Sequence, residues 1–238
     1  MPKKPEKSNL QELREWTSNR SDERKNYLLT GLDCEEGVLM LNSLKLILIA
    51  LIGIISGCAH PIYLTPNLDD LRNTNVEVEN KINKNVAYYI SEQDRATEVI
   101  TPGGGGDKVS YYPYEDTEAA LNTMLMKVFN YVYSIPLIKQ AAFIQEKNIS
   151  YIFKPSIKTD SSSDSIFTWP PTHFTFELTC TATEPSGNEV WSKKVKAEGN
   201  AEYDEFKKNF SLSARRASEE AFKLMLAELL NANYFKED

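Results

Sequence analysis

Side chains that often carry out chemistry are scarce in this sequence and are not grouped. It has two histidines, His60 and His173, and neither lies in a zinc-binding or nucleophile motif. A metal site would need several ligands at usable spacings, and no His and Cys cluster provides them. Neighbouring carboxylates such as Glu219 and Glu220 would point apart on a helix. We therefore predict that the protein is not an enzyme and holds no metal or cofactor.

A run of four glycines at residues 103–106 stands close to Lys108 and invites comparison with a phosphate-binding loop. That loop requires the pattern G-x-x-x-x-G-K-[ST], in which the lysine follows a glycine directly. Here Asp107 precedes the lysine and Val109 follows it. The run is therefore interpreted as a hairpin or flexible loop.

Cys58 is the one residue with an assignable chemistry, because of what precedes it. Residues 40–57 begin with a polar segment carrying Lys45, continue through the apolar run 46–55, and end on small residues. This is the three-part organisation of a secretory signal peptide. The sequence Ile55-Ser56-Gly57-Cys58 resembles the lipobox of bacterial lipoproteins. The resemblance implies that the signal is cut before Cys58, which is diacylated and then N-acylated.

Two other interpretations of the apolar run stay open. It could remain uncut as an inner-membrane anchor, although it is shorter than the about 20 apolar residues that a spanning helix needs. It could instead be a buried core helix, although it lacks a polar face.

Residues 1–39 form a charged leader that fits no signal. We predict that translation starts at Met40 and that the leader is not translated; the alternative is a genuine cytosolic extension. The whole chain has a net charge of −7, and residues 1–57 carry equal numbers of acidic and basic side chains, so residues 58–238 keep that charge. An acidic surface argues against nucleic acid as a partner.

Residues 58–238 are long enough for one domain with a real core. With Cys34 in the leader and Cys58 assigned to lipid, Cys180 has no disulfide partner and is expected to be buried in a strand. Ala59, in the place where enterobacterial lipoproteins that stay at the inner membrane carry Asp, implies the outer membrane by the same resemblance. We therefore expect the protein to be located at the periplasmic face of the bacterial outer membrane.

Residues 58–85 contain two prolines and little apolar periodicity, which predicts a tether in front of a single periplasmic domain at 86–238. In that domain, apolar periodicity predicts a strand at 86–90, an edge strand at 109–114, a helix from Asp116 or Thr117 to about Val132, a second helix at 136–148 and a strand at 149–158.

Strict alternation makes His173–Thr183 the clearest strand, with Cys180 on its buried face and His173 on the wet face. Residues 190–201 return as its antiparallel partner, and a long helix follows from Ser211 or Ser213. The order predicts an α+β fold in two layers: a mostly antiparallel sheet with helices packed on one face.

This order, with the hairpin pattern F-x-L-x-C-x-A and Gly199-Asn200-Ala201 before the last helix, is similar to small envelope lipoproteins of the YajG type. It looks more loosely like the TolB N-terminal and LptE domains. The resemblance covers about residues 86–232 and implies contact with another envelope protein.

The leading hypothesis is a lipid-anchored, non-catalytic binding or assembly module attached to the membrane through Cys58. Aromatic residues are enriched at interface cores, which makes Tyr111, Tyr112, Tyr114 and Trp169 candidates for the partner contact. The same residues could instead be ordinary edge packing. Alternatives are a structural or adaptor subunit of a secretion or transport complex, and a lipid-handling protein with a deep apolar groove.

Overall fold

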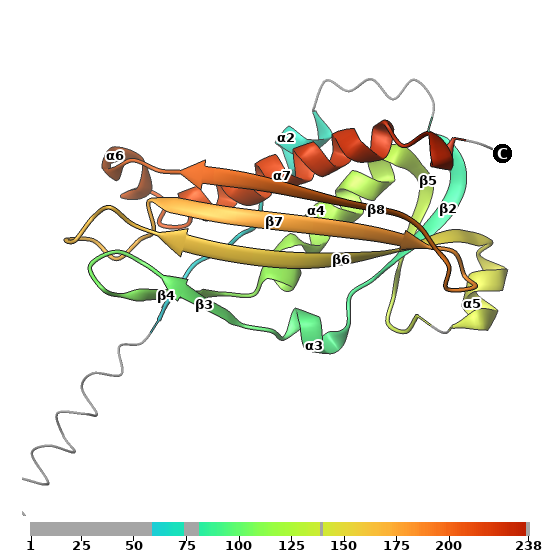
Figure 1. Cartoon of the computed structure of the whole chain (residues 1–238), viewed down its shortest axis with the longest axis horizontal. Helices are drawn as coiled ribbons and strands as arrows, with labels where there is room; N and C mark the ends of the chain where they lie inside the picture. The colour runs from blue at the N-terminus through green and yellow to red at the C-terminus, as the bar shows by residue number, and fades with distance from the viewer. Residues whose placement is uncertain (1–58, 74–80, 139, 237–238) are drawn as a thin grey trace, which may run out of the picture. The chain divides into compact units, whose positions relative to one another are not determined.

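A five-stranded mixed sheet, in the order β5-β2-β6-β7-β8, is the largest element of the computed structural model, which describes residues 59–73, 81–138 and 140–236 (Figure 1). Strand β2 is parallel to β5 and β6, whereas β6, β7 and β8 are antiparallel. The strands are β2 (Ile82–Tyr89), β5 (Phe129–Ile135), β6 (Ile149–Ser162), β7 (His173–Thr183) and β8 (Glu189–Asn200).

Strand β7 confirms the alternation predicted from the sequence. Phe176, Leu178 and Cys180 are fully buried, and the residues between them are more exposed. His173 lies at the exposed start of the strand. Because period-two alternation places every second side chain on the core face, the sequence was sufficient to orient this strand.

Two long helices, α4 (Pro113–Val128) and α7 (Leu212–Leu230), cover the face of the sheet on which these side chains lie. Phe222 of α7 packs on Phe176 with ring centroids 6.2 Å apart. After α7, the short helix η1 (Asn233–Phe235) places Phe235 against Phe129 and Phe153. One continuous core therefore lies between the sheet and the helices.

A second, smaller core lies on the other face of β2 and β6. Ala87 and Ile152 alternate along these strands with residues of the main core, and they pack with Ile144 of α5 (Ala141–Glu146). Helix α5 lies at the right-hand end of the sheet in Figure 1.

A three-stranded sheet, in the order β1-β4-β3, flanks the large one. Its strands are β1 (His60–Pro61), β3 (Val99–Pro102) and β4 (Lys108–Tyr111), and the short helix α3 (Glu92–Arg95) leads into it. Buried hydroxyls join it to β6: Thr101 Oγ1 lies 2.6 Å from Ser161 Oγ, and the Tyr111 hydroxyl donates to Thr159 Oγ1 over 2.8 Å. The antiparallel β3–β4 pair confirms the predicted hairpin around the glycine run.

The α+β class is confirmed, with three differences in detail. Both sheets are mixed rather than mostly antiparallel, since β2 and β1 each pair in parallel. The helix predicted to reach Val132 ends at Val128, and Phe129 begins a strand instead. The predicted helix at 136–148 is reduced to α5.

The prediction that residues 58–85 are a tether is wrong for the part that the structure describes. Ile62, Leu64 and Leu71 are fully buried in the main core, and helix α2 (Leu68–Arg72) is capped by the Asn67 side chain. The compact unit spans Cys58–Asp238 and does not begin at residue 86. Three apolar residues separated by polar ones are enough to tie an irregular segment into a core, although they form no periodic pattern.

Candidate functional site

The backbone that follows β1 is held by polar side chains of α4 and α7. The Tyr63 N–H donates to Ser211 Oγ over 3.0 Å, and the Leu64 N–H donates to Asp116 Oδ2 over 2.9 Å. Arg215 Nε donates to the Thr65 carbonyl over 3.0 Å. Burial raises the pKa of Asp116, and the Leu64 N–H partly offsets this. The start of the described chain is therefore fixed to the domain.

His60 joins this start to the loop between β6 and β7, residues 163–172. Its ring stacks on that of Trp169 with centroids 4.3 Å apart, and its Nε2 lies 3.5 Å from Asp107 Oδ2. A solvated linker histidine would make neither contact. The residue next but one to Cys58 therefore contacts the loop directly.

The glycine run lets the β3–β4 hairpin pack tightly against the same loop. The Gly104 N–H donates to the Trp169 carbonyl over 2.8 Å. A Cβ atom on Gly104 would lie 1.8 Å from the Thr168 carbonyl oxygen, and one on Gly103 would lie 2.4 Å from that of Trp169. Real Cβ atoms do not approach so closely, so the glycines are required here by backbone packing rather than by a phosphate.

Four large apolar or aromatic side chains are exposed around this loop, and we call them the apolar tip: Ile166, Phe167, Tyr203 and Phe210. Phe167 is 90% exposed and Ile166 is 75% exposed. They line an open cleft of about 480 Å³ between the loop and α6 (Tyr203–Phe206). Figure 1 shows this loop, α6 and the β3–β4 hairpin at one end of the described unit, opposite α5.

The four aromatic residues proposed for partner contact do not form one surface. Tyr111 is 1% exposed, so the prediction that it offers a contact surface is wrong. Tyr114 is half-buried, and its hydroxyl accepts the Ile157 N–H over 3.2 Å. Tyr112 is exposed, and Trp169 is half-buried and packs on Phe210 beneath the apolar tip with ring centroids 4.9 Å apart. Of the four, Trp169 alone lines the cleft at the tip.

A histidine closes the base of the loop. His173 Nε2 lies 2.7 Å from Asp164 Oδ2, and its Nδ1 lies 2.6 Å from Asn200 Oδ1. Hydrogen bonds to Asp164 first, and then to Asn200, raise the pKa of His173. The protonated ring can donate to both oxygens at once, so it ties the loop to the end of β8.

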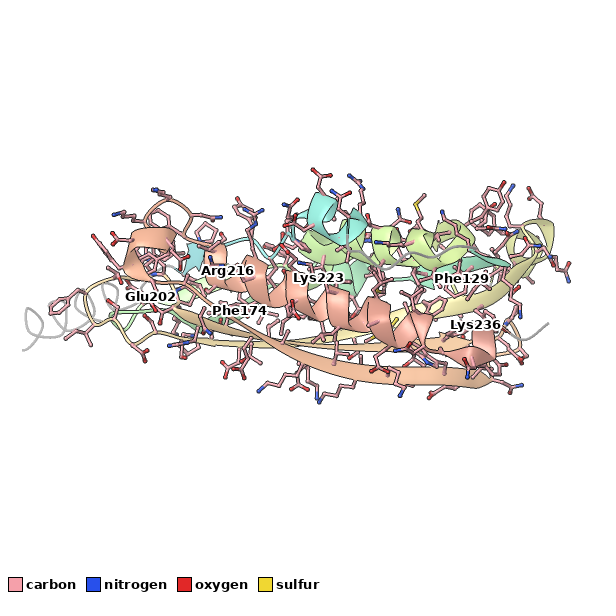
Figure 2. All side chains as sticks on the ribbon, turned by 90° about the horizontal axis from the view of Figure 1, so that it is seen from above. Phe129, Phe174, Glu202, Arg216, Lys223 and Lys236 are labelled. Atoms are coloured by element: carbon pink, nitrogen blue, oxygen red, sulfur yellow. The ribbon has the colours of Figure 1, made fainter. Side chains whose placement is uncertain are left out.

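Helix α6 is fixed to α7 by an arginine. Arg216 binds the Glu205 carboxylate through two nitrogens, at 2.7 Å and 3.0 Å, and donates to the Asn200 carbonyl over 2.7 Å. The hydrogen bonds from the Arg216 side chain are the main cause that lowers the pKa of Glu205 to about 2. Figure 2 shows Arg216 near Glu202 at the same end of the unit.

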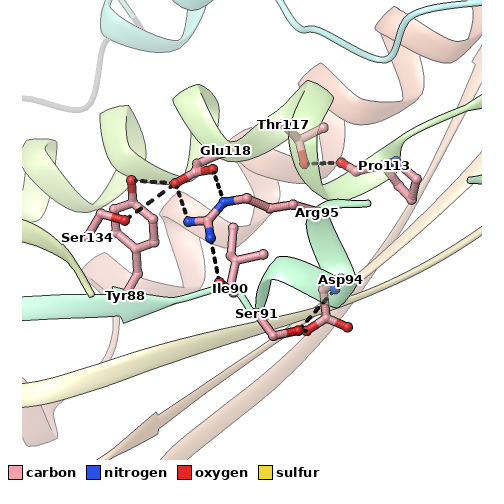
Figure 3. A network of polar contacts seen from close by, with 9 residues as sticks. All are labelled: Tyr88, Ile90, Ser91, Asp94, Arg95, Pro113, Thr117, Glu118 and Ser134. Carbon is pink, nitrogen blue, oxygen red and sulfur yellow. Dashed lines mark hydrogen bonds and ion pairs between the residues drawn. The ribbon is translucent and has the colours of Figure 1, made fainter. Parts of the chain in front are cut away.

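A second polar network joins α3, α4 and β2. Arg95 Nε and Nη2 each lie 2.8 Å from an oxygen of Glu118, Arg95 Nη1 donates to the Ile90 carbonyl, and the Tyr88 hydroxyl donates to Glu118 (Figure 3). The pKa of Glu118 is lowered, mainly by the hydrogen bonds from Arg95. The Arg95–Glu118 ion pair and the Tyr88 hydroxyl join α3, α4 and β2.

Residues 59–73, 81–138 and 140–236 contain no group of three His, Cys, Asp or Glu side chains that could hold a metal ion. Among these residues, no helix is both long and apolar enough to cross a membrane. Cys180 is fully buried, as predicted, and burial raises its pKa to about 12. The leader, the apolar run and the lipobox residues Ile55, Ser56, Gly57 and Cys58 lie outside the described residues.

Ile166 and Phe167 were not predicted from the sequence. Both stand alone in a polar segment, between Ser161–Asp164 and Trp169-Pro170-Pro171, so they contribute to no helix or strand period. Two adjacent large apolar residues in a serine-rich loop were the available signal, because a loop usually carries polar residues at its exposed positions.

No family model and no curated protein matches the chain. Among solved structures, it is similar to a Xanthomonas campestris protein of the DUF330 family, at 11% identity and a TM-score of 0.42, over 77% of this chain and 100% of that one. It is similar to a PelC variant, a dodecamer from Paraburkholderia phytofirmans, at 15% identity and a TM-score of 0.33, over 59% of this chain and 90% of that one.

A candidate lipoprotein from Caulobacter crescentus matches at 12% identity and a TM-score of 0.26, over 38% of this chain and 70% of that one. None of these three is described as of the YajG, TolB or LptE type. At these identities and scores the matches assign no function.

Proposed function

We propose that the chain is a bacterial envelope lipoprotein, anchored by acyl chains on Cys58 at the periplasmic face of the outer membrane, with a non-catalytic binding or assembly domain. The observation that carries the proposal is the position of the lipobox. Its cysteine directly precedes Ala59, and the compact unit spans Cys58–Asp238. Cleavage before Cys58 would therefore remove the signal and leave the whole domain attached to the lipidated cysteine.

The anchor itself would be strong. A single acyl chain gives only marginal membrane binding, and stable attachment takes two signals. Cys58 with three chains would exceed that requirement. The acidic net charge of −7 makes attraction to anionic headgroups a poor substitute for the lipid.

The end of the domain opposite the apolar tip supports a partner contact. There, a cleft of about 540 Å³ is lined by Ile138, Ile144, Pro185 and neighbouring residues, and Leu137 beside it is exposed. Exposed apolar patches on a folded protein often mark a contact with another protein. We propose this cleft, rather than Tyr111, as the region that meets another envelope component.

Intact-mass analysis of the purified membrane form tests the anchor. We expect a chain that starts at Cys58 and carries the mass of three acyl groups. Cys58→Ser should leave an uncut precursor or a soluble form, while Cys180→Ala, at a buried cysteine, serves as the matched control and should be processed normally. Normal processing and membrane attachment of Cys58→Ser would refute the proposal.

The binding role is tested by placing a photo-crosslinking residue at Ile138 and, as a control, at Lys158 on the exposed face of β6. A single heterologous envelope protein captured from Ile138 and not from Lys158 supports a binding module. A stoichiometric ring of copies of this chain would support the adaptor alternative instead.

A further inference from the structure

The apolar tip is held in solvent by an ordered loop. Phe167 and Ile166 are adjacent and exposed, yet the backbone around them is fixed by hydrogen bonds. The Gly105 N–H donates to the Ser165 carbonyl over 3.0 Å, and Thr168 Oγ1 donates to Ser165 Oγ over 2.7 Å. These bonds hold the loop with both side chains directed outward, so covering them with another apolar surface would be favourable.

The tip lies beside the point at which the lipid would enter the membrane. Cys58 is two residues from His60, so their Cα atoms are at most about 7.6 Å apart. Phe167 is two residues from Trp169, with the same limit of about 7.6 Å. Since the rings of His60 and Trp169 stack at 4.3 Å, the acyl chains and the tip start from the same end of the domain.

The described residues that follow Cys58 are fixed to the domain and do not form a free tether. Ile62 and Leu64 are buried, and the backbone at residues 63–65 is bonded to α4 and α7. A lipid on Cys58 would therefore draw this end of the domain to the bilayer surface.

Electrostatic attraction to the membrane does not explain the apolar tip. The two charged residues that line the cleft, Asp107 and Lys207, have opposite signs, so neither sign dominates around the tip. Apolar side chains with an amphipathic Tyr203 suit the boundary between headgroups and acyl chains.

We infer that the apolar tip inserts Ile166 and Phe167 into the interfacial region of the bilayer that the lipid on Cys58 enters, and so sets the orientation of the domain on the membrane. The inference rests on the proposed lipid anchor. It makes the contact independent of salt and of anionic lipid, because no net charge takes part.

The test uses the mature lipoprotein in phosphatidylcholine vesicles with a fluorophore on one introduced cysteine. Phe167→Cys is compared with Leu137→Cys at the opposite end; both positions are exposed. Cys180 does not compete for the label, because it is fully buried and its pKa is raised to about 12. We expect blue-shifted emission and quenching by nitroxide-labelled lipid at 167, and neither at 137.

A measurement without a label follows Trp169, which packs beneath the tip, with brominated lipid as the quencher. The double variant I166D/F167D should lose this quenching and keep the unfolding midpoint of the wild type, since both side chains are exposed. A control double variant, Lys193→Asp with Lys194→Asp on strand β8, should retain the quenching.

Several results would overturn the inference. A lipidated protein whose label at 167 stays in water in vesicles refutes insertion while the proposed anchor stands. Protection of that label in native membranes but not in pure vesicles would assign the tip to a protein partner. Intact mass of the same sample reports the lipid, and its absence from Cys58 would refute both the anchor and this inference.

Discussion

Leu64→Ala tests whether the segment directly after the lipobox is part of the folded domain. Leu64 is fully buried, its N–H is bonded to Asp116, and its carbonyl accepts the Ser218 hydroxyl. Removing a buried leucine side chain costs about 2–5 kcal/mol, from lost apolar burial and the cavity that remains. A domain of this size loses about 2–4 °C in Tm per kcal/mol, so the expected fall is about 4–20 °C.

The assay is thermal unfolding of the mature protein followed by circular dichroism. Tyr63→Ala is the matched control: the side chain is 63% exposed, and the backbone bond to Ser211 does not depend on it. The control should change stability by less than about 0.5 kcal/mol. If Leu64→Ala unfolds at the same temperature as Tyr63→Ala, residues 62–65 behave as a tether. The lipid on Cys58 would then not keep the apolar tip at the membrane surface, and the inferred insertion would lose its basis.

Three further outcomes are expected. Gly104→Ala should lower stability by about 1–3 kcal/mol, because its Cβ would meet the Thr168 carbonyl at 1.8 Å; an unchanged unfolding midpoint would contradict that close approach. Glu118→Gln should cost about 1–3 kcal/mol near neutral pH. Since the pKa of Glu118 is lowered by Arg95, its contribution is present above the unfolded pKa and lost as pH falls through the folded one, and acid unfolding curves that coincide for wild type and variant would refute the pairing. The pKa of His173 is raised, so its contribution is complete below the unfolded pKa of about 6.5 and is lost as pH rises through the folded pKa. A proton NMR titration, in which the signal is assigned by its loss in His173→Gln, should give a pKa above about 6.5, and a value at or below that would contradict the contact with Asp164.

Much of the fold could be predicted because its elements are strongly periodic. The alternation along β7 and the three- and four-residue spacing along α7 persist for many residues, so local patterns and tertiary structure agree. The same rule failed where two elements adjoin without a break. Phe129 and Val132 continue the helical spacing of α4, yet they belong to β5. Pairing with β2 supplies hydrogen bonds that a helical extension could not make with the sheet.

The candidate site was the least predictable part. The resemblance of residues 55–58 to a lipobox is local and visible in the sequence, whereas the apolar tip depends on which loop lies beside the first residues of the domain. Tyr111 and Phe167 are both aromatic residues near turns, but one is 1% exposed and the other 90%. Residue type alone does not distinguish them, because exposure is set by neighbours that are distant in the chain.

The sequence by itself determined the resemblance of residues 55–58 to a lipobox, the acidic character, the lack of grouped catalytic side chains and the α+β class, since each depends on composition or on short-range order. Only the tertiary structure decided that residues 59–73 contribute to the core and that the glycine run packs against the 163–172 loop. It also decided that Ile166 and Phe167 are exposed beside the start of the domain. These features arise from contacts such as that of His60 with Trp169, between residues more than one hundred positions apart, which no local pattern encodes.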